Sequence, residues 1–475
     1  MTNLKRNFIY NSILTLSGYV FPLLTFPYIS RVLGANNVGI VNLVLSIVDY
    51  YILFSTLGLS IVGLREIARC KDRNQINLVF SQLVSLHLIL TTTVFAIYCI
   101  SIICIPTFEK YSPLYWIGGL KIIFNVFLIE WFFQGLQDFK YITYRSLFIK
   151  TLYVIAILTF VRTRNDYTIY FAITIAQIVI NSIINWQYSK KLVTYRFSIN
   201  GLKYYIKPLV SWGINIILLS FYTTFNVMYL GFVAGPLYVG YYTTATKIYT
   251  IILSLLQAYN GVFIPYLSSL QSQGNIAEFK NTINKSFTIV SSLSIPLVVL
   301  CYCLAPEIID VIAGKEFLPA IYSFRIMVFQ ILIIGISQIT NSQILLSLKK
   351  DKEILISTLI GSIICITIIV LFAERNKDIA ASYAVTISHI VEFFFLLYYA
   401  KRSLDFRFPV KDFINCALLT VPMIFICRYI KNNIETSIMI CIIATLLSLI
   451  YYLPIIYYIK KKEFVNHLHK KSHNE

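Results

Sequence analysis

Residues 8–62 read FIYNSILTLSGYVFPLLTFPYISRVLGANNVGIVNLVLSIVDYYILFSTLGLSIV, two long apolar stretches separated by GANN at 34–37. A helix needs about 20 mostly apolar residues to cross a bilayer, and each stretch is long enough. Such a short connection is typical of antiparallel helical neighbours. The segment therefore predicts a hairpin of two membrane spans.

The whole chain has the composition of a membrane protein. Of its 475 residues, 58% are hydrophobic and 13% are charged, and the mean hydropathy is +0.74. Soluble domains have about 45–50% apolar and about 25% charged residues, so the composition excludes a soluble protein. The first apolar stretch is too long for a secretory signal and lacks a small-residue cleavage pattern, so we expect it to be retained.

The same pattern repeats along the chain and predicts an all-α polytopic membrane protein with about 14 transmembrane helices, within a range of 12 to 14. The expected spans lie near 8–30, 38–62, 78–104, 114–134, 142–161, 167–188, 208–233, 238–262, 285–305, 321–347, 354–372, 379–400, 412–430 and 436–458.

The distribution of basic residues predicts that both termini are cytoplasmic. The loops and tails on the N-terminal side hold 28 Lys and Arg, the opposite side holds 9, and three lie inside spans. Lys and Arg accumulate in cytoplasmic loops. This topology explains the net charge of +19 better than nucleic-acid binding does. Lys460–Lys462, just after the last span, are expected to meet anionic lipid headgroups.

A shift of 201 residues indicates an internal repeat. It aligns GANNVG (34–39) with GPLYVG (235–240), and glycine supplies backbone freedom in both expected outer turns. A repeat of six spans enters the membrane in the same direction each time. We therefore expect two pseudo-symmetric six-helix lobes around a central cavity, residues 1–197 and 198–405. Residues 406–475 hold two further helices and a basic cytoplasmic tail.

Three segments carry a resemblance to a known family: PYISRVLGANNVGI (27–40), EWFFQGLQDFKYITYRSLFIK (130–150) and VGYYTTATKIYTI (239–251). Together they resemble O-antigen flippases, the polysaccharide-transporter branch of the multidrug/oligosaccharidyl-lipid/polysaccharide exporter superfamily. The resemblance implies a bacterial inner-membrane protein that moves a polyprenyl-pyrophosphate-linked oligosaccharide from the cytoplasmic to the periplasmic leaflet.

The resemblance also implies alternating access of two lobes and coupling to a cation, either a proton or sodium. It implies no other cofactor. The expected partners are the lipid-linked oligosaccharide, membrane lipids, and a polysaccharide polymerase and chain-length regulator. No nucleic-acid partner and no metal site are expected.

Ionisable residues inside spans are the first candidates for function, because a charge in the bilayer is costly. Lys247 lies about seven residues, roughly 10 Å, inside its span. Asp49 lies near the membrane midplane, one turn beyond Ser46, the repeat equivalent of Lys247. We hypothesise that Lys247 and Asp49 pair in one access state and separate when the anionic substrate binds Lys247. The alternative is a static ion pair.

Other charged side chains are weaker candidates for the cavity. Lys121 lies about 12 Å inside its span and is expected to face the cavity. Glu130 either lines the cavity or pairs with Arg145. Arg31 and Arg325 lie near outer helix ends, where long cationic side chains reach the headgroups, and contact with substrate phosphate is the alternative.

Aromatic and histidine side chains complete the candidate site. Most of the Tyr and Phe residues suit membrane-interface belts, but Tyr241 and Tyr242 are candidates for sugar contact. His389 and Glu392 share one helix face and could exchange a proton during coupling, with His87 as an alternative. The competing interpretation is a histidine that is satisfied in the core.

The sequence leaves three other functions open. A capsule or exopolysaccharide unit is an alternative cargo, and a multidrug antiporter is an alternative on the same scaffold. A membrane enzyme of lipid-linked sugars is the least favoured. The sequence has no HExxH, Walker A or GxGxxG motif, so we expect no enzyme and no ATP-driven transport.

Overall fold

The computed structural model describes residues 2–404, 406 and 408–472, and within this part the chain is helical without strands. It describes no side chains for residues 2–5, 8, 255, 258, 259, 261, 262, 265 and 457–472, so the basic cluster Lys460–Lys462 lies outside the described side chains. Two compact units are present. One is Met1–Thr243 with Phe372–Lys377, and the other is Thr244–Leu371 with Asp378–Glu475.

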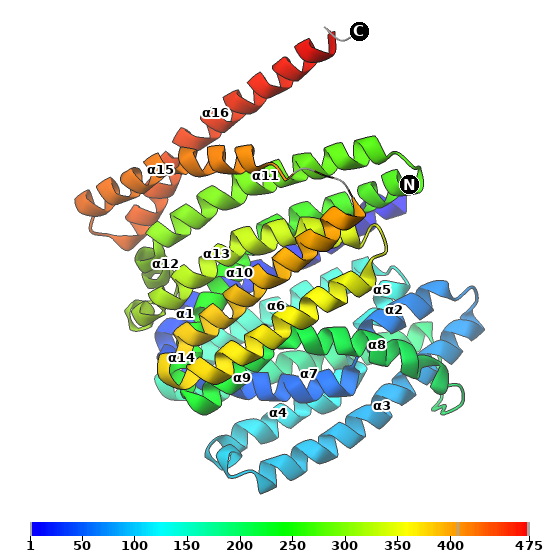
Figure 1. The fold of residues 1–475 in the computed structure, drawn as a ribbon. Coiled ribbons are helices and arrows are strands. Elements are labelled where there is room, and N and C mark those ends of the chain that lie inside the picture. The colour runs from blue at the N-terminus through cyan, green and yellow to red at the C-terminus, as the bar shows by residue number, and fades with distance from the viewer. Residues whose placement is uncertain (1, 405, 407, 473–475) are drawn as a thin grey trace. The chain divides into compact units, whose positions relative to one another are not determined.

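The first unit is built around α1, which packs against α3, α4 and α6, while α4 packs against α7 (Figure 1). Its helices are α1 (Thr2–Thr56), α2 (Leu59–Arg69), α3 (Arg73–Cys104), α4 (Ser112–Asn125), α5 (Glu130–Gly135), α6 (Phe139–Phe160), α7 (Tyr167–Leu192), α8 (Lys203–Ser220) and α9 (Thr224–Val233). Short 3₁₀ turns lie at Pro106–Tyr111, Val126–Leu128 and Arg164–Asp166.

Polar residues at the helix starts explain several boundaries. The Asp72 carboxylate accepts a hydrogen bond from the Gln75 amide at 2.8 Å, and the Gln75 side chain accepts one from the Lys71 amide at 3.0 Å. Asp138 accepts from the Tyr141 amide at 3.3 Å. These contacts satisfy amides that have no partner inside the helix, so α3 and α6 begin where such side chains occur.

The predicted turn glycines adopt the backbone conformation that the turn requires. Gly34 has φ 75° inside α1, and Gly235 has φ 91° immediately before α10 (Pro236–Ser272). Residues with a Cβ rarely adopt this region, and glycine does so without steric cost. The 55 residues of α1 are enough for two passes of a bilayer, and the helix is interrupted at Gly34, whose backbone is not helical.

An extended segment after α7 lies along α3. Its amides donate hydrogen bonds of 3.0 Å from Thr194 to Asn77, from Arg196 to Ser81 and from Ser198 to Ser85. Two residues of extended chain advance about 6.6 Å and four residues of helix advance about 6 Å. Every second residue of the extended segment therefore meets every fourth residue of α3. This polar face of α3 holds the expected cytoplasmic linker in place.

The second unit holds the remaining helices, with α11 packed against α13 and α15, and α15 packed against α16. Their bounds are α11 (Ile276–Cys303), α12 (Ala305–Ile312), α13 (Ile321–Gln338), α14 (Asp351–Ser403), α15 (Val410–Asn433) and α16 (Ser437–Ser472). A 3₁₀ turn covers Lys315–Ala320, and α13 continues into a π-helical stretch, Ile339–Leu345. The 53-residue α14 contains one non-helical residue, Lys377.

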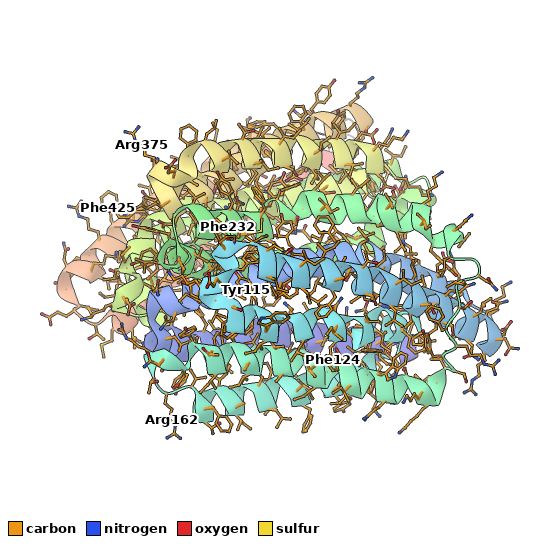
Figure 2. The ribbon with its side chains drawn as sticks, turned by 90° about the horizontal axis from the view of Figure 1, so that it is seen from below. Tyr115, Phe124, Arg162, Phe232, Arg375 and Phe425 are labelled. Carbon is orange, nitrogen blue, oxygen red and sulfur yellow. The ribbon has the colours of Figure 1, made fainter. Side chains whose placement is uncertain are left out.

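Many large apolar side chains lie on the outside of the helices. Phe425 is 66% exposed and Leu371 is 67% exposed, and Figure 2 shows Phe425 projecting away from the ribbon. Such surfaces mark contact with lipid when they extend along whole helices. In the described part of the chain, ten helical segments are long and apolar enough to cross a membrane, or eleven with the bent pair α8 and α9.

These observations confirm the predicted class, an all-α polytopic membrane protein. The segment that contains α1 and the segment that contains α14 are each long enough for two passes, and each contains a non-helical residue. The count of fourteen spans and the lobe boundaries stay predictions.

Candidate functional site

The expected fourth span is broken rather than continuous. Helix α4 ends at Asn125, and Ile129 has φ 23° and ψ 34° before α5 begins at Glu130. A branched residue with positive φ costs on the order of 1–3 kcal/mol and persists only when its surroundings hold it. The Asn185 side chain of α7 supplies that hold, because its amide nitrogen donates to the Leu128 carbonyl.

Asn185 also belongs to a buried charged network. Its side-chain oxygen accepts a hydrogen bond from Arg145 on α6, and the Arg145 guanidinium forms an ion pair with Glu130. Arg145 is 5% exposed, whereas the side chain of Glu130 is 39% exposed. Tyr141, one turn from Arg145, donates to Asn185 at 3.2 Å. The break in the fourth span is thus tied to α6 and α7 by polar contacts.

A second pair of polar contacts joins α1 to α4 before the break. Lys121 forms an ion pair with Asp49, and the Asn125 side chain donates to the Thr56 hydroxyl at 2.9 Å. The side chain of Asp49 is 44% exposed and that of Lys121 is 15% exposed. Asp49 therefore has a cationic partner within its own unit.

A cavity of about 200 Å³ lies beside the broken span. Its lining residues are Thr56, Leu59, Ser60, His87, Asn125, Leu128, Ile129, Glu130, Trp131 and Gln134. His87 is 3% exposed, and its Nε2 has no hydrogen-bond partner among the described residues. A strained helix break, a buried histidine and a polar cavity thus occur together in the first unit.

Another polar cluster lies on α14 in the second unit. The His389 Nδ1 is 3.2 Å from one Glu392 oxygen, and the other oxygen accepts a hydrogen bond from Thr358 at 2.9 Å. The expected shared face of His389 and Glu392 is confirmed. Their role in coupling stays a prediction.

The remaining charged candidates take different positions. Lys247 lies on α10, partly buried, in the second unit, whereas Asp49 lies in the first. Arg31 donates to the Pro27 carbonyl at 2.8 Å. Arg325 lies 5.1 Å above the Tyr302 ring and donates to the Tyr302 carbonyl at 3.4 Å. The pairing of Lys247 with Asp49 stays a prediction for another access state, because Asp49 here pairs with Lys121.

Tyr241 and Tyr242 are buried on α10, at 9% and 3% exposure. The Tyr241 ring contacts Tyr238 edge-on, with centroids 6.1 Å apart. Sugar contact by either ring requires this part of α10 to become exposed, and it stays a prediction.

The two repeat turns pack against each other within the first unit. A Cβ added to Gly39 would lie 1.7 Å from the Pro236 carbonyl oxygen, and one added to Gly240 would lie 2.1 Å from that of Ala35. These contacts are related by the 201-residue shift, as are Asn42 and Thr243, which are hydrogen-bonded at 3.2 Å. The two turns therefore make reciprocal contacts, while the duplication into two lobes stays a prediction.

Sequence reasoning missed the role of Asn185 and the helix break. It also missed Lys150, which donates to the Ser17 hydroxyl at 2.8 Å. Asn185 left no distinguishing signal, because it lies near the end of the expected span 167–188, which also holds Gln177, Asn181 and Gln187. The sequence does not indicate the partners of any of these amides, and those of Asn185 come from the turn Val126–Leu128 and from α6.

The fold and the polar networks among its apolar helices define a polytopic all-α membrane protein. The chain belongs to the polysaccharide biosynthesis protein family, whose model matches residues 4–271.

Two relatives have names that agree with this family. Over 386 residues the chain is 23% identical to a protein of Escherichia coli (strain K12) named as an O-antigen transporter, covering 80% of this chain and 92% of the relative. A protein of Shigella dysenteriae with the same name is 23% identical over 366 residues, covering 76% of this chain and 91% of that one.

Solved structures show the same fold. The lipid II flippase MurJ, in an inward closed conformation, matches with a TM-score of 0.80 and 16% identity over 96% of this chain and 100% of that one. An inward-facing multidrug transporter of the MATE family matches with a TM-score of 0.64 and 13% identity, over 83% of this chain and 98% of its own. The matches are transporters rather than enzymes, in agreement with the sequence.

Proposed function

We propose that the chain is a flippase that moves a polyprenyl-pyrophosphate-linked oligosaccharide, an O-antigen repeat unit, from the cytoplasmic to the periplasmic leaflet. The observation that carries this proposal is the family match together with ion pairs that join membrane helices. A sugar and a diphosphate cannot cross hydrocarbon bare, because burying unpaired polar groups and charges is costly. Charged and hydrogen-bonding side chains inside the helices offset that cost.

The transport cycle is alternating access coupled to a proton or sodium gradient. Packing of the turns at 34–39 and 235–240 supports a state that is closed at the expected outer end of these hairpins. In the cycle Lys247 binds the diphosphate, and His389 with Glu392 exchanges the coupling proton. Opening requires these turns to separate, and closing requires their glycines to meet again.

The protein lies in the bacterial inner membrane with both termini in the cytoplasm, as the excess of Lys and Arg on the N-terminal side supports. A polysaccharide polymerase and a chain-length regulator act on the unit after it is flipped. A capsule or exopolysaccharide unit has the same chemistry as cargo.

A multidrug antiporter is the second candidate, because the inward-facing MATE-family structure shares the fold. The anionic side chains nearest the broken span are already paired with cations, Asp49 with Lys121 and Glu130 with Arg145. Paired carboxylates are poor sites for a cationic drug, so the flippase is favoured.

Complementation tests the proposal. The chain is expressed in a bacterium that lacks its own O-unit flippase and has a compatible repeat-unit pathway, and the lipid-linked unit is assayed in each leaflet. We expect surface polymer to return and the unit to reach the periplasmic leaflet. If the unit stays cytoplasmic with the cognate pathway supplied, the flippase proposal is wrong and drug efflux is assayed next.

A further inference from the structure

We propose that the cavity beside the broken fourth span is a sugar subsite, which holds one hydroxylated ring of the lipid-linked oligosaccharide. This inference rests on the proposed function and adds the location and the ligand chemistry of one part of the substrate site. The cavity is defined by residues of α1 to α5, from Thr56 to Gln134.

The charge of the cavity wall favours a neutral ligand. Glu130 is the acidic residue of the lining, and Arg145 neutralises it through their ion pair. An anionic diphosphate would meet the Glu130 carboxylate, and an alkali cation would lie close to the Arg145 guanidinium. The cavity therefore favours neither an anionic nor a cationic ligand, whereas an uncharged polar molecule meets no electrostatic repulsion.

The polar groups of the wall favour hydroxyl groups in particular. Hydroxyls from Thr56 and Ser60, amides from Asn125 and Gln134 and the His87 imidazole line the same space. A sugar hydroxyl both donates and accepts hydrogen bonds, so it can pair with each of these groups. A polyprenyl tail would leave the buried His87 imidazole without a partner, at a cost of about 1–3 kcal/mol.

The shape of the cavity is fixed in advance by the helix break. Asn185 holds the Leu128 carbonyl, and Arg145 holds Glu130, so two lining residues are positioned by α6 and α7. The volume of about 200 Å³ is smaller than the range of about 300–1,000 Å³ that is usual for pockets of drug-sized ligands, which suits one ring rather than the whole oligosaccharide. Ser60 is exposed and Gln134 is partly exposed, which gives the cavity an opening.

Two variants test the subsite without touching the buried network. Gln134→Leu removes hydrogen-bonding groups at similar size, and Ser60→Phe fills the opening. Gln187→Leu is the matched control, because Gln187 is an exposed glutamine on α7 that does not line this cavity. Affinity of each purified protein is measured for two probes: the cognate lipid-linked repeat unit and the bare polyprenyl pyrophosphate.

We expect Gln134→Leu to weaken binding of the repeat unit by about 3- to 10-fold, since about one hydrogen bond is lost. Ser60→Phe should weaken it at least as much, and Gln187→Leu should not. Affinity for the bare pyrophosphate should be unchanged in all three variants, as should the unfolding temperature.

Other results separate the two proposals. Equal losses for both probes would show that the variants do not act on the sugar, and no loss for either would show that the cavity does not bind it; each result would overturn the sugar subsite. Wild-type protein that binds neither probe would overturn the proposed function itself, and the subsite with it.

Discussion

Asn185 holds two parts of the first unit together through one amide group. It donates to the Leu128 carbonyl at the helix break and accepts from the buried Arg145 guanidinium. Asn185→Ala should lower the free energy of unfolding by about 1.5–3 kcal/mol, because a hydrogen bond to a buried charge is lost. Thermal unfolding in detergent measures the change.

Asn181, one turn earlier on α7, is the matched control for this prediction. The Asn181 side-chain oxygen has no hydrogen-bond partner among the described residues. Asn181→Ala should therefore leave the unfolding temperature nearly unchanged. Equal effects of the two substitutions would show that Asn185 does not hold the break.

Substitution of Lys247 distinguishes a residue that binds substrate from a residue that forms a structural ion pair. If it binds the diphosphate, Lys247→Gln should reduce export by about tenfold or more, since a hydrogen bond to a charged group is lost. The unfolding temperature should change little, and Lys247→Arg should restore part of the export. Export is measured as lipid-linked unit in the periplasmic leaflet.

The double variant Asp49→Lys with Lys247→Asp exchanges the two charges and tests the alternative, a structural ion pair. Retained export in this variant would favour a structural pair and end the substrate-binding role of Lys247. Lys121→Gln, tested in parallel, measures how far the observed Asp49–Lys121 pair contributes to stability.

At the scale of elements, the crossing of α1 and α10 depends on two glycines. An added methyl group at Gly39 would overlap the Pro236 carbonyl, so Gly39→Ala should separate the two turns. The measurement is thiol cross-linking between Asn42→Cys and Thr243→Cys, in a protein without its native cysteines. We expect efficient cross-linking with glycine at position 39 and little with alanine.

Gly18→Ala is the control for this crossing. A Cβ added at Gly18 meets no atom within 4 Å, so the helix should gain up to about 1 kcal/mol from the better helix former. Cross-linking should be as efficient as with Gly18. Cross-linking that persists in the Gly39→Ala protein would contradict the role of this contact.

At the scale of the whole molecule, native cysteines at the two ends of α3 report the orientation of the chain. Cys70 precedes α3 and Cys104 ends it. With one cysteine retained at a time, an impermeant maleimide should label Cys104 in spheroplasts and Cys70 only in inside-out vesicles. The reverse pattern would place the termini outside and overturn the expected topology.

The pH dependence of labelling gives a second check on Cys70. Burial, with the nearby carboxylates of Glu66 and Asp72, raises the pKa of the Cys70 thiol above its usual value. The reactive thiolate is therefore scarcer at neutral pH, and the labelling rate should rise at a higher pH than for a free thiol. Denatured protein, in which these neighbours are absent, is the reference.

The class of the protein and the position of its turns follow from the order of its amino acids. Apolar stretches of membrane length fix where helices form, since no other structure satisfies the backbone in hydrocarbon. Local signals of a few residues, such as Asp72 before α3 and Gly34 within the first hairpin, set boundaries because the groups they satisfy lie nearby in the chain. The Glu130–Arg145 ion pair could be predicted for the same reason, because both residues lie in the segment 130–150 that resembles the flippase family.

Which polar groups meet depends on how the helices pack in three dimensions. Asp49 pairs with Lys121, 72 residues away, and Asn185 reaches a carbonyl 57 residues away. Helical periodicity predicts the helix face on which a residue lies, but not which distant helix packs against that face. In a nearly uniform apolar sequence, many helix packings are compatible with the same hydrophobic pattern. The break at Ile129 follows the same rule, because its strained backbone is held by a side chain from another helix rather than by its own neighbours.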